Sequence, residues 1–563
     1  MMELHAATDF GDEFVGGERF YDRANIDALM AYLASMGVKR LEWIYHCWLA
    51  FDDSYPLGFD IEAEAVRAAH RHGIDFVAVI KPFECLGLYL LPHAFPIART
   101  ECWNSVRGLF HQVSDLAIAR PDLCLKRKPG VRDPGGPVTA VRLVKADDRP
   151  SGLEADDLSI WTSHENGSWT RYEGPFRLEQ SVEWRPLFPK PGNCRVLTLS
   201  GLEIPESQRY IEVRTRRPDP NGDFVCDLDS VIELVGADGA VLPRTPPGLI
   251  FERDRFSPLK STAFRKVTRH WNTPEVEALL TGAQERLAQW NADTRDYAHK
   301  GQPYVAYDFN RRGRVAVARG VDEALPIPHP IYPEVRAYWL GKARRFLDLG
   351  ADGIDFRHCT HFNQYDHREY GFNEPVLERT GGSLNMGEVA RVNGEAYTQL
   401  LREAAALTHS RGKRFGVHVL THYLRASEEN RGDAIIGNFA LPWERWVREF
   451  ADYAVFRGAM GFRTATVREV VDRIGLACRE AGKSLVFQSN RRQYSFGGPL
   501  PVQDHELAWV TRHPDVSAYQ LYETASFTRL DAQGGLTGSE AVRALVGKHG
   551  FASRLSRLPK HNP

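Results

Sequence analysis

An acidic and a basic side chain occupy alternate positions in the segment Leu349–His358, whose sequence is Leu-Gly-Ala-Asp-Gly-Ile-Asp-Phe-Arg-His. Alternate residues of a strand face opposite sides, so the apolar Ile354 and Phe356 belong to one face. Asp355 and Arg357 then share the other. In a parallel barrel the inward face near the carboxyl end of a strand lines the active site. The segment therefore predicts a catalytic or ligand-binding pair, with a buried ion pair that fixes the strand as the alternative.

The loop after this strand offers two further chemistries. Imidazole and carboxylate groups are common metal ligands, and His358, His361, Asp366 and His367 of the loop are the candidate ligands. Their spacing matches no zinc motif, and we expect neither a metal nor another cofactor. The second chemistry is acid-base catalysis, in which Glu374 of an Asn-Glu-Pro sequence would fold back over Asp355. The same glutamate and proline could equally begin a helix.

Helices and strands that alternate along the chain would position these groups. Eight strands are expected: Arg40–His46, Asp75–Lys81, Tyr304–Asp308, Gly353–His358, Arg414–Leu420, Tyr453–Arg457, Ser484–Asn490 and Val516–Tyr522. Amphipathic segments with helical periodicity separate most of them, which is typical of a parallel sheet. Eight such units favour a closed (β/α)₈ barrel, an α/β TIM barrel, over an open doubly wound sheet.

The alternation of helices and strands is interrupted between about residues 137 and 256. Short alternating segments separated by turn sequences such as Asn221-Gly and Asp238-Gly replace the helices, which predicts an inserted antiparallel β-sandwich. We therefore divide the chain into residues 1–134, the first part of the barrel with two strands, residues 135–260, the insert, and residues 261–563, the rest of the barrel. The insert could bind carbohydrate or only brace the barrel.

Several expected barrel strands end in an inward polar group. A packed core would hold Val, Ile and Leu there, because an unpaired buried polar group costs about 1–3 kcal/mol. Polar groups that converge at strand ends are better explained as a lined pocket. The candidate binding residues are Tyr45, His46, Lys81, Asp308, Arg357, His358, His361, His418, Gln488, Asn490, Arg491 and Tyr522. In the first expected strand Glu42 and His46 share a face with Ile44, so its inward face is ambiguous.

The composition excludes several classes of partner. Lys+Arg 71 against Asp+Glu 73 gives a net charge of -2, so we expect neither nucleic acid nor a membrane surface as partner. The eight cysteines form no C-x-x-C pair. The first residues lack the pattern of a signal peptide, and no apolar run approaches transmembrane length, so a cytoplasmic protein is expected. It could form a homo-oligomer.

A family resemblance adds to these inferences. The segments Tyr332-Pro-Glu-Val-Arg336, Gly350–Arg357, His361 and Tyr370-Gly-Phe-Asn-Glu-Pro-Val376 resemble bacterial proteins described as glycoside hydrolase family 10-like, or glycosidase-like, barrels. The likeness covers the barrel and is densest over residues 332–376. It implies a (β/α)₈ glycosidase-type fold and a carbohydrate substrate.

This chain departs from well-known retaining barrel glycosidases at the seventh strand, where Phe487-Gln-Ser-Asn stands in place of a glutamate. An aspartate nucleophile on the fourth strand beside an arginine fits Asp355 instead, since Arg357 would keep it ionised. The partner acid would be Glu374 or Glu523, with Asp308, Glu428 and Glu429 as further choices.

We therefore predict a glycoside hydrolase that cleaves an oligosaccharide or glycoside by carboxylate chemistry. A metal-dependent sugar isomerase, epimerase or lyase and a non-catalytic carbohydrate-binding barrel are the alternatives.

Overall fold

Eight parallel strands close into a barrel in the order β1-β2-β3-β16-β17-β18-β19-β20. A computed structural model describes residues 2–9, 23–45, 59–83, 114–131, 135–145, 147–164, 170–185, 192–215, 231–243, 248–249, 314–320, 324–358, 369–420, 438–457, 465–489, 500–530 and 535–551. The barrel strands are β1 (Glu3–Asp9), β2 (Val38–Tyr45), β3 (Asp75–Ile80), β16 (Gly353–Phe356), β17 (Arg414–Leu420), β18 (Tyr453–Arg457), β19 (Ser484–Gln488) and β20 (Val516–Tyr522). The predicted (β/α)₈ fold is confirmed.

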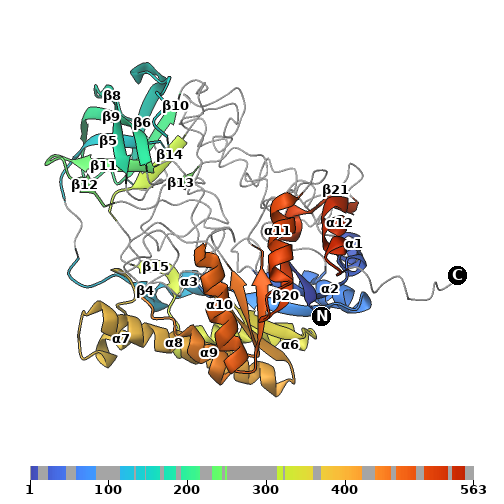
Figure 1. Cartoon of the computed structure of the whole chain (residues 1–563). Helices are drawn as coiled ribbons and strands as arrows, with labels where there is room; N and C mark the ends of the chain where they lie inside the picture. Colours follow the sequence, from blue (N-terminus) through green and yellow to red (C-terminus); the bar gives the residue numbers. More distant parts are fainter. Residues whose placement is uncertain are drawn as a thin grey trace.

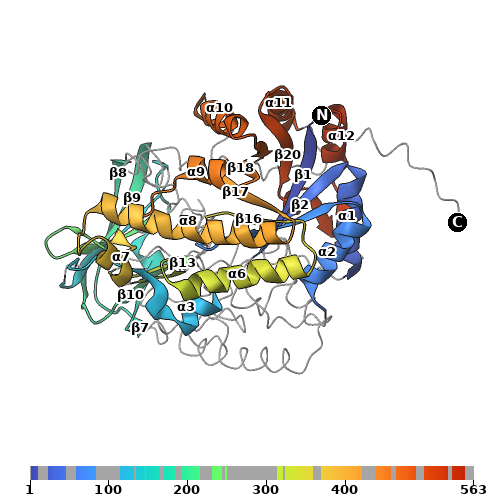
Figure 2. The same cartoon turned by 90° about the horizontal axis from the view of Figure 1, so that it is seen from below.

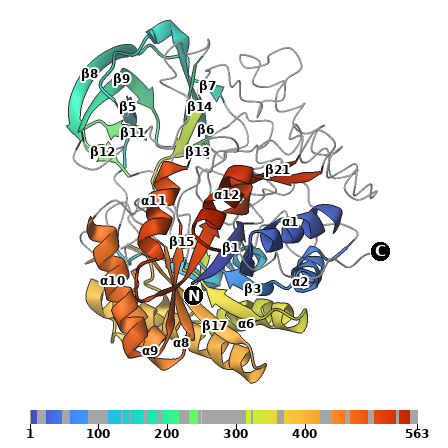
Figure 3. The ribbon, with the colours of Figure 1, turned by 45° about the vertical axis from the view of Figure 1, so that its right-hand side comes forward.

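Helices surround the barrel (Figure 1). They are α1 (Arg23–Ser35), α2 (Ile61–Arg71), α6 (Pro333–Asp348), α8 (Met386–Ser410), α9 (Trp443–Glu449), α10 (Ala465–Glu480), α11 (Pro501–Val510) and α12 (Glu540–Lys548). Helices α6 and α8 lie side by side along one flank (Figure 2), whereas α10 packs on β18 and β19 and α11 packs on β20 (Figure 3). Within the described residues, no helix combines the length and the apolar character needed to cross a membrane.

One of the eight predicted strands was wrong. The segment Glu3–Asp9 forms β1 and pairs with both β2 and β20. Strand β3 pairs directly with β16, with Val79 opposite Asp355, so no strand fits between them. The first part of the chain therefore supplies three barrel strands instead of two. The segment Tyr304–Asp308, expected as the third strand, lies outside the described residues.

Local signals explain why the helix-strand units begin and end where they do. The Asp60 carboxylate accepts a hydrogen bond of 2.9 Å from the backbone N–H of Ala63 and so caps the start of α2. Gly73 follows α2 with φ of 69°, a left-handed conformation that costs glycine little. Strand β3 then starts at Asp75.

The outer face of the barrel forms the main hydrophobic core. Leu41, Phe76, Phe356, Phe415 and Leu521 are 0–1% exposed and pack against the helices. A separate small cluster of alternate residues, Ala7, Ile44, Val79 and Tyr522, fills part of the inside.

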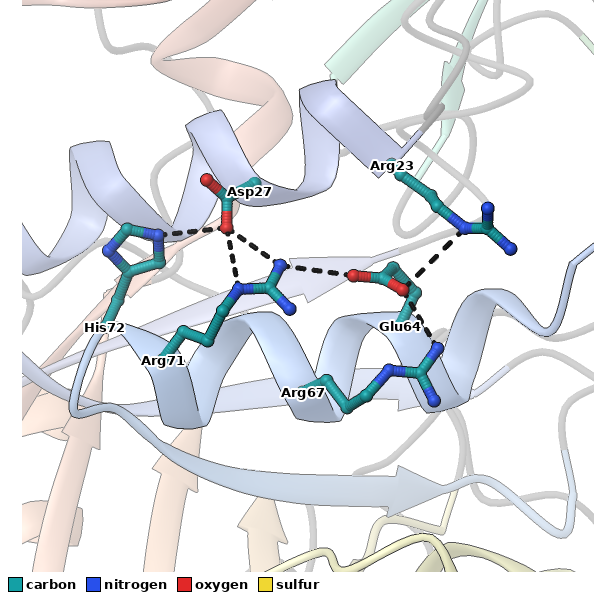
Figure 4. A network of polar contacts seen from close by, with 6 residues as sticks. All are labelled: Arg23, Asp27, Glu64, Arg67, Arg71 and His72. Carbon is teal, nitrogen blue, oxygen red and sulfur yellow. Dashed lines mark hydrogen bonds and ion pairs between the residues drawn. The ribbon is translucent and has the colours of Figure 1, made fainter.

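A salt-bridge network joins α1 to α2 on the outside of the molecule (Figure 4). The Asp27 carboxylate of α1 accepts hydrogen bonds from Arg71 (2.9 Å) and His72 (3.1 Å), and these partners lower the pKa of Asp27. The other members of the network are Arg23, Glu64 and Arg67. Because such exposed pairs contribute little each, roughly 0–1 kcal/mol, the packing of the two helices on the barrel matters more.

Two five-stranded sheets lie together at one side of the molecule, away from the barrel helices (Figure 1). Their strands are β5 (Val138–Val144), β6 (Leu158–Ser163), β7 (Thr170–Arg171), β8 (Arg177–Arg185), β9 (Gly192–Ile204), β10 (Tyr210–Thr215), β11 (Val231–Gly236), β12 (Val241–Leu242), β13 (Gly248–Leu249) and β14 (Arg314–Ala318). Strand β14 follows residue 260, beyond the predicted end of the insert. The sandwich and its boundaries stay a prediction.

The remaining described elements are short. They are α3 (Asp115–Ala119), α7 (Glu374–Arg379), the 3₁₀ turns at Pro121–Leu123, Ala155–Asp157 and Thr524–Ser526, and the strand pairs β4 (Cys124–Lys126) with β15 (Ala324–Pro328) and β21 (Thr528–Leu530) with β22 (Leu536–Gly538).

Candidate functional site

The inside of the barrel carries charged and amide side chains where a packed core would carry aliphatic ones. Eight of them are no more than 4% exposed: His5, Arg40, Glu42, Asp355, Arg357, His418, Gln488 and Gln520. Burial of so many polar groups is costly unless they satisfy one another. Their partners therefore show which groups belong to the folded structure and which remain for a ligand.

Four side chains form a middle cluster, which we define as Glu42, Asp355, His418 and Tyr453. The Tyr453 hydroxyl donates a hydrogen bond to Oδ1 of Asp355. The Nε2 atom of His418 lies 3.4 Å from Oε2 of Glu42 and 3.5 Å from Oδ2 of Asp355. One imidazole thus stands between two carboxyl groups that come from different strands, β2 and β16.

Gly416 on β17 makes room for this cluster. It lies opposite both Asp355 and Tyr453 in the strand register. A Cβ atom at this position would collide with the Asp355 carboxylate and the Tyr453 ring. The contact between tyrosine and aspartate therefore depends on a glycine in the strand between them.

Mutual interactions set the charges of the middle cluster. Burial lowers the pKa of His418, but the nearby Glu42 carboxylate, together with Asp355, outweighs burial and raises it overall. Burial raises the pKa of Glu42, yet the charge of His418 lowers it overall. For Asp355, burial and then the charge of Glu42 keep the pKa raised, despite the contacts with His418 and Tyr453. The cluster thus favours an ionised Glu42, a protonated His418 and an Asp355 that is hard to ionise.

These contacts overturn the expected role of Arg357. The sequence suggested that Arg357 would keep Asp355 ionised, but the described partners of Asp355 are Tyr453 and His418. The pKa of Asp355 is raised by its burial, not lowered by an arginine. Arg357 and Asp355 do share the inward face, as predicted, but belong to different environments.

The barrel mouth, which we define as Asp9, Lys81, Arg357, Arg457, Tyr522 and Glu523, lies at the carboxyl ends of the strands. The Tyr522 ring is the common contact of two guanidinium groups there. The guanidinium group of Arg357 lies 5.6 Å from the centroid of the Tyr522 ring, and that of Arg457 lies 4.7 Å from the same centroid. Nη2 of Arg457 also lies 3.4 Å from the Tyr522 hydroxyl. Tyr522 and Arg357 are therefore inward, as predicted.

The mouth also holds two buried carboxyl groups on neighbouring strands. Asp9 ends β1, is 0% exposed and has Oδ2 3.8 Å from Nζ of Lys81. Glu523 directly follows β20 and is 4% exposed. The two strand ends are tied by a 3.0 Å hydrogen bond from the Thr524 hydroxyl to the Thr8 hydroxyl. The two carboxyl groups thus lie at adjacent strand ends of the mouth.

The inward amide of Gln488, a predicted binding residue, contacts the amide of Gln520. Nε2 of Gln488 donates a hydrogen bond of 2.5 Å to Oε1 of Gln520. The backbone N–H of Ser489 also donates to the carbonyl of Gln520 (3.0 Å), and this bond extends the pairing of the two strands. Gln488 and His418 do face inward, as predicted.

Two predicted binding residues face away from the barrel interior. Tyr45 faces the helices and packs edge-on against Phe346 of α6, because it shares its face with Leu41 and Trp43. His358 alternates outward after Arg357 and stacks on the Phe83 ring at 4.4 Å. Neither position suits a ligand inside the barrel.

Glu374 is also displaced from the barrel interior. It is exposed and begins α7, with Pro375 in the first turn, which is the helix-start role. Helix α7 packs through Val376 on Val389 and Val392 of α8, in a cluster separate from the main core. The other predicted residues, His46, Asp308, His361, Asn490 and Arg491, lie outside the described residues.

The sequence prediction missed Asp9, Glu42, Tyr453 and Arg457. Strand β1 carried only a weak signal, because Ala6 and Ala7 give little contrast between its two faces. For Glu42 the signal was visible but ambiguous, because it shares a face with Ile44.

The middle cluster also contains the one group of metal-ligand type found among the described residues. One atom each of Glu42, Asp355 and His418 lie within 4.8 Å of one another. Two carboxylates and one imidazole suit several divalent metals. Of the histidine-rich loop considered for a metal on the sequence, His361, Asp366 and His367 lie outside the described residues.

Comparisons with known proteins give no family for the chain. No protein-family model matches it, and no curated protein matches its sequence. It resembles the catalytic domain of a beta-amylase from Paenibacillus polymyxa with 8% identity and a TM-score of 0.34, over 97% of this chain and 99% of that one.

Two further solved structures are similar at the same low level. An endo-beta-1,4-mannanase from Thermotoga petrophila has 7% identity and a TM-score of 0.35, over 99% of this chain and 78% of that one. A chitinase catalytic domain from Ostrinia furnacalis has 9% identity and a TM-score of 0.23, over 39% and 72%. The fold assignment accordingly rests on the strand order of the barrel.

Proposed function

We propose that the chain is a glycoside hydrolase whose chemistry takes place at the barrel mouth. The observation that carries the proposal is the pair of buried carboxyl groups, Asp9 and Glu523, at the ends of neighbouring strands. Enzymes built on this fold place their reacting groups at that end of the barrel. The resemblance of residues 332–376 to glycoside hydrolase family 10-like barrels supports a carbohydrate substrate.

Glycoside cleavage needs two carboxyl groups, about 5–9.5 Å apart depending on the stereochemical outcome. Neighbouring strands lie about 4.8 Å apart, so Asp9 and Glu523 can meet this requirement. Asp9, held by the Lys81 ammonium group, is suited to the role of nucleophile or base. Glu523 then supplies the proton for the leaving group.

Asp355, put forward from the sequence as nucleophile, has a different position in this proposal. It lies in the middle cluster, enclosed by Tyr453, His418 and the Gly416 backbone. A raised pKa makes Asp355 harder to ionise, and a carboxylate nucleophile must be ionised. We therefore assign the two catalytic carboxyl groups to the mouth.

The test is the hydrolysis of a panel of 4-nitrophenyl glycosides by the full chain and by Glu523→Gln. We expect the variant to stay folded and to lose turnover by roughly 10²–10⁴-fold, the usual contribution of a positioned acid. Glu374→Gln, at an exposed helix start, is the control and should retain full activity. A folded wild-type protein that binds glycosides of the panel without cleaving any would instead favour a non-catalytic binding barrel.

A metal-dependent sugar isomerase, epimerase or lyase is the second candidate, and the group of Glu42, Asp355 and His418 favours it. Glu42, Asp355 and a neutral His418 would hold the ion, which would supply Lewis-acid chemistry there. The chelator-treated protein should then gain thermal stability on addition of Mn²⁺ or Zn²⁺, and Asp355→Asn should remove that gain. An unchanged melting temperature with either ion would exclude this candidate.

A further inference from the structure

Arg357 is a fully buried cation for which the described residues supply no carboxylate partner. Its side chain follows β16, is 0% exposed, and its backbone N–H donates to the Ile80 carbonyl at 3.0 Å. Among the described residues, none of the three guanidinium nitrogens has a hydrogen-bond partner. A buried charge costs several kcal/mol unless it is paired, so this arrangement is unfavourable in the isolated chain.

A second buried arginine of the same chain shows the usual solution. Arg214 of β10 is also 0% exposed, but its Nη2 donates to Oε2 of Glu212 at 2.9 Å. Its guanidinium group also lies 3.9 Å from the centroid of the Trp161 ring. The sheet therefore supplies a carboxylate to its buried arginine, whereas the described part of the barrel mouth supplies Arg357 with the Tyr522 ring.

The surroundings of Arg357 add positive charge. Arg457 contacts the same Tyr522 ring, and Lys81 directly follows β3, the strand next to β16, so three cations line this part of the mouth. Asp9 is engaged by Lys81 at 3.8 Å, and Asp355 by the middle cluster. Asp9 and Asp355 thus already have partners of their own.

We infer that the ligand of the barrel mouth carries an acidic group, and that Arg357 binds it. The planar guanidinium group can donate two parallel hydrogen bonds to a carboxylate or sulfate, and in a water-excluded site this pairing is strong. A neutral sugar hydroxyl would leave the charge uncompensated. The inference rests on the proposed function, and it names the substrate class as an acidic glycoside, a uronide or a sulfated sugar.

Matched pairs of 4-nitrophenyl glycosides test this directly. The β-D-glucuronide and β-D-glucoside differ only at C6, where a carboxylate replaces a hydroxymethyl group. Corresponding α-gluco and galacto pairs, and N-acetylglucosaminide with its 6-sulfate, complete the set. We expect kcat/KM for one acidic member to exceed that of its neutral partner by about 30-fold or more, which corresponds to about 2 kcal/mol. The uronide and sulfate pairs distinguish the two sources of acid.

Arg357→Met assigns the effect to this side chain. Removal of an unpaired buried charge should leave the melting temperature unchanged or raise it, while the preference for the acidic member disappears. Arg214→Met is the matched control and should lower the melting temperature, because it leaves Glu212 buried without its partner. A fall for Arg357→Met as large as that of the control would show a structural role and overturn the inference.

Binding measurements with free sugars separate the inference from the proposed function. The acidic probes are D-glucuronate, D-galacturonate and glucose 6-sulfate, and the neutral references are D-glucose and D-galactose. Equal cleavage of neutral and acidic glycosides would refute the acidic substrate and leave hydrolysis standing. Arg357-dependent binding of an acidic sugar without cleavage of any glycoside would refute hydrolysis and retain the acidic ligand. Absence of both binding and preference for every acidic probe would overturn the inference.

Discussion

Asp355 and Arg357 lie two residues apart on the same face of the same chain segment, yet the barrel treats them differently. In the middle cluster, Asp355 is held by Tyr453 and His418. At the mouth, Arg357 has no hydrogen-bond partner among the described residues. The middle cluster places a histidine within 3.5 Å of two carboxyl groups, whereas the described surroundings of Arg357 offer its guanidinium group an aromatic ring. We therefore interpret the middle cluster as a structural layer and the mouth as the proposed functional one.

The strongest test of the structural layer is to remove one charge from it. Glu42→Gln leaves His418 with only Asp355, whose ionisation burial opposes. We expect the free energy of unfolding to fall by about 3 kcal/mol or more, as for other broken buried pairs. Urea denaturation measures this, with the exposed Glu374→Gln as control, which should change stability by less than about 0.5 kcal/mol. A Glu42→Gln variant as stable as the control would contradict the assignment.

A smaller effect is expected from overpacking the same layer. Gly416→Ala pushes a methyl group into the contact between Asp355 and Tyr453 and should cost about 1–3 kcal/mol. The control is Gly341→Ala on α6, where nothing lies within 4 Å of the added carbon. Alanine has the higher helix propensity, so the control should gain up to about 1 kcal/mol. Equal effects of the two substitutions would show that the middle cluster tolerates displacement.

Two buried histidines differ in the direction in which their surroundings shift the pKa. His418 has two buried carboxyl neighbours and a raised pKa. Burial lowers the pKa of His5 to about 4, against a hydrogen bond with the exposed Glu3. Between pH 6.5 and 4.5 the unfolded chain takes up a proton at His5 that the folded chain excludes. His5 therefore lowers the free energy of unfolding as the pH is lowered, by up to about 1.4 kcal/mol per pH unit.

The variant His5→Asn should flatten the pH dependence of unfolding in that window. Denaturation midpoints for both proteins at pH 4.5, 5.5 and 6.5 measure the difference. Identical slopes would mean that the pKa of His5 is the same in the folded and the unfolded chain, which would contradict the effect of its burial.

The sequence predicted the barrel well because hydrophobic alternation and helix periodicity are local signals. Seven of the eight expected segments form barrel strands, and Asp355, His418 and Gln488 face inward as predicted. Strand β1 escaped because Ala6 and Ala7 give little contrast between its faces. The partners of Asp355 could not be predicted, since Tyr453, His418 and Glu42 lie on three other strands and meet only when the barrel closes. Glu374 is the opposite case. Its Asn-Glu-Pro motif is visible in the sequence, but the residue begins an exposed helix instead of folding back over Asp355.

The most direct test of the central claim compares Glu523→Gln with Asp355→Asn on the best glycoside of the panel. If the mouth carries the chemistry, Glu523→Gln loses roughly 10²–10⁴-fold in kcat while Asp355→Asn, correctly folded, stays within about tenfold of the wild type. If Asp355→Asn abolishes turnover in a folded protein and Glu523→Gln retains it, the reaction belongs to the middle of the barrel and the assignment of function to its mouth is wrong.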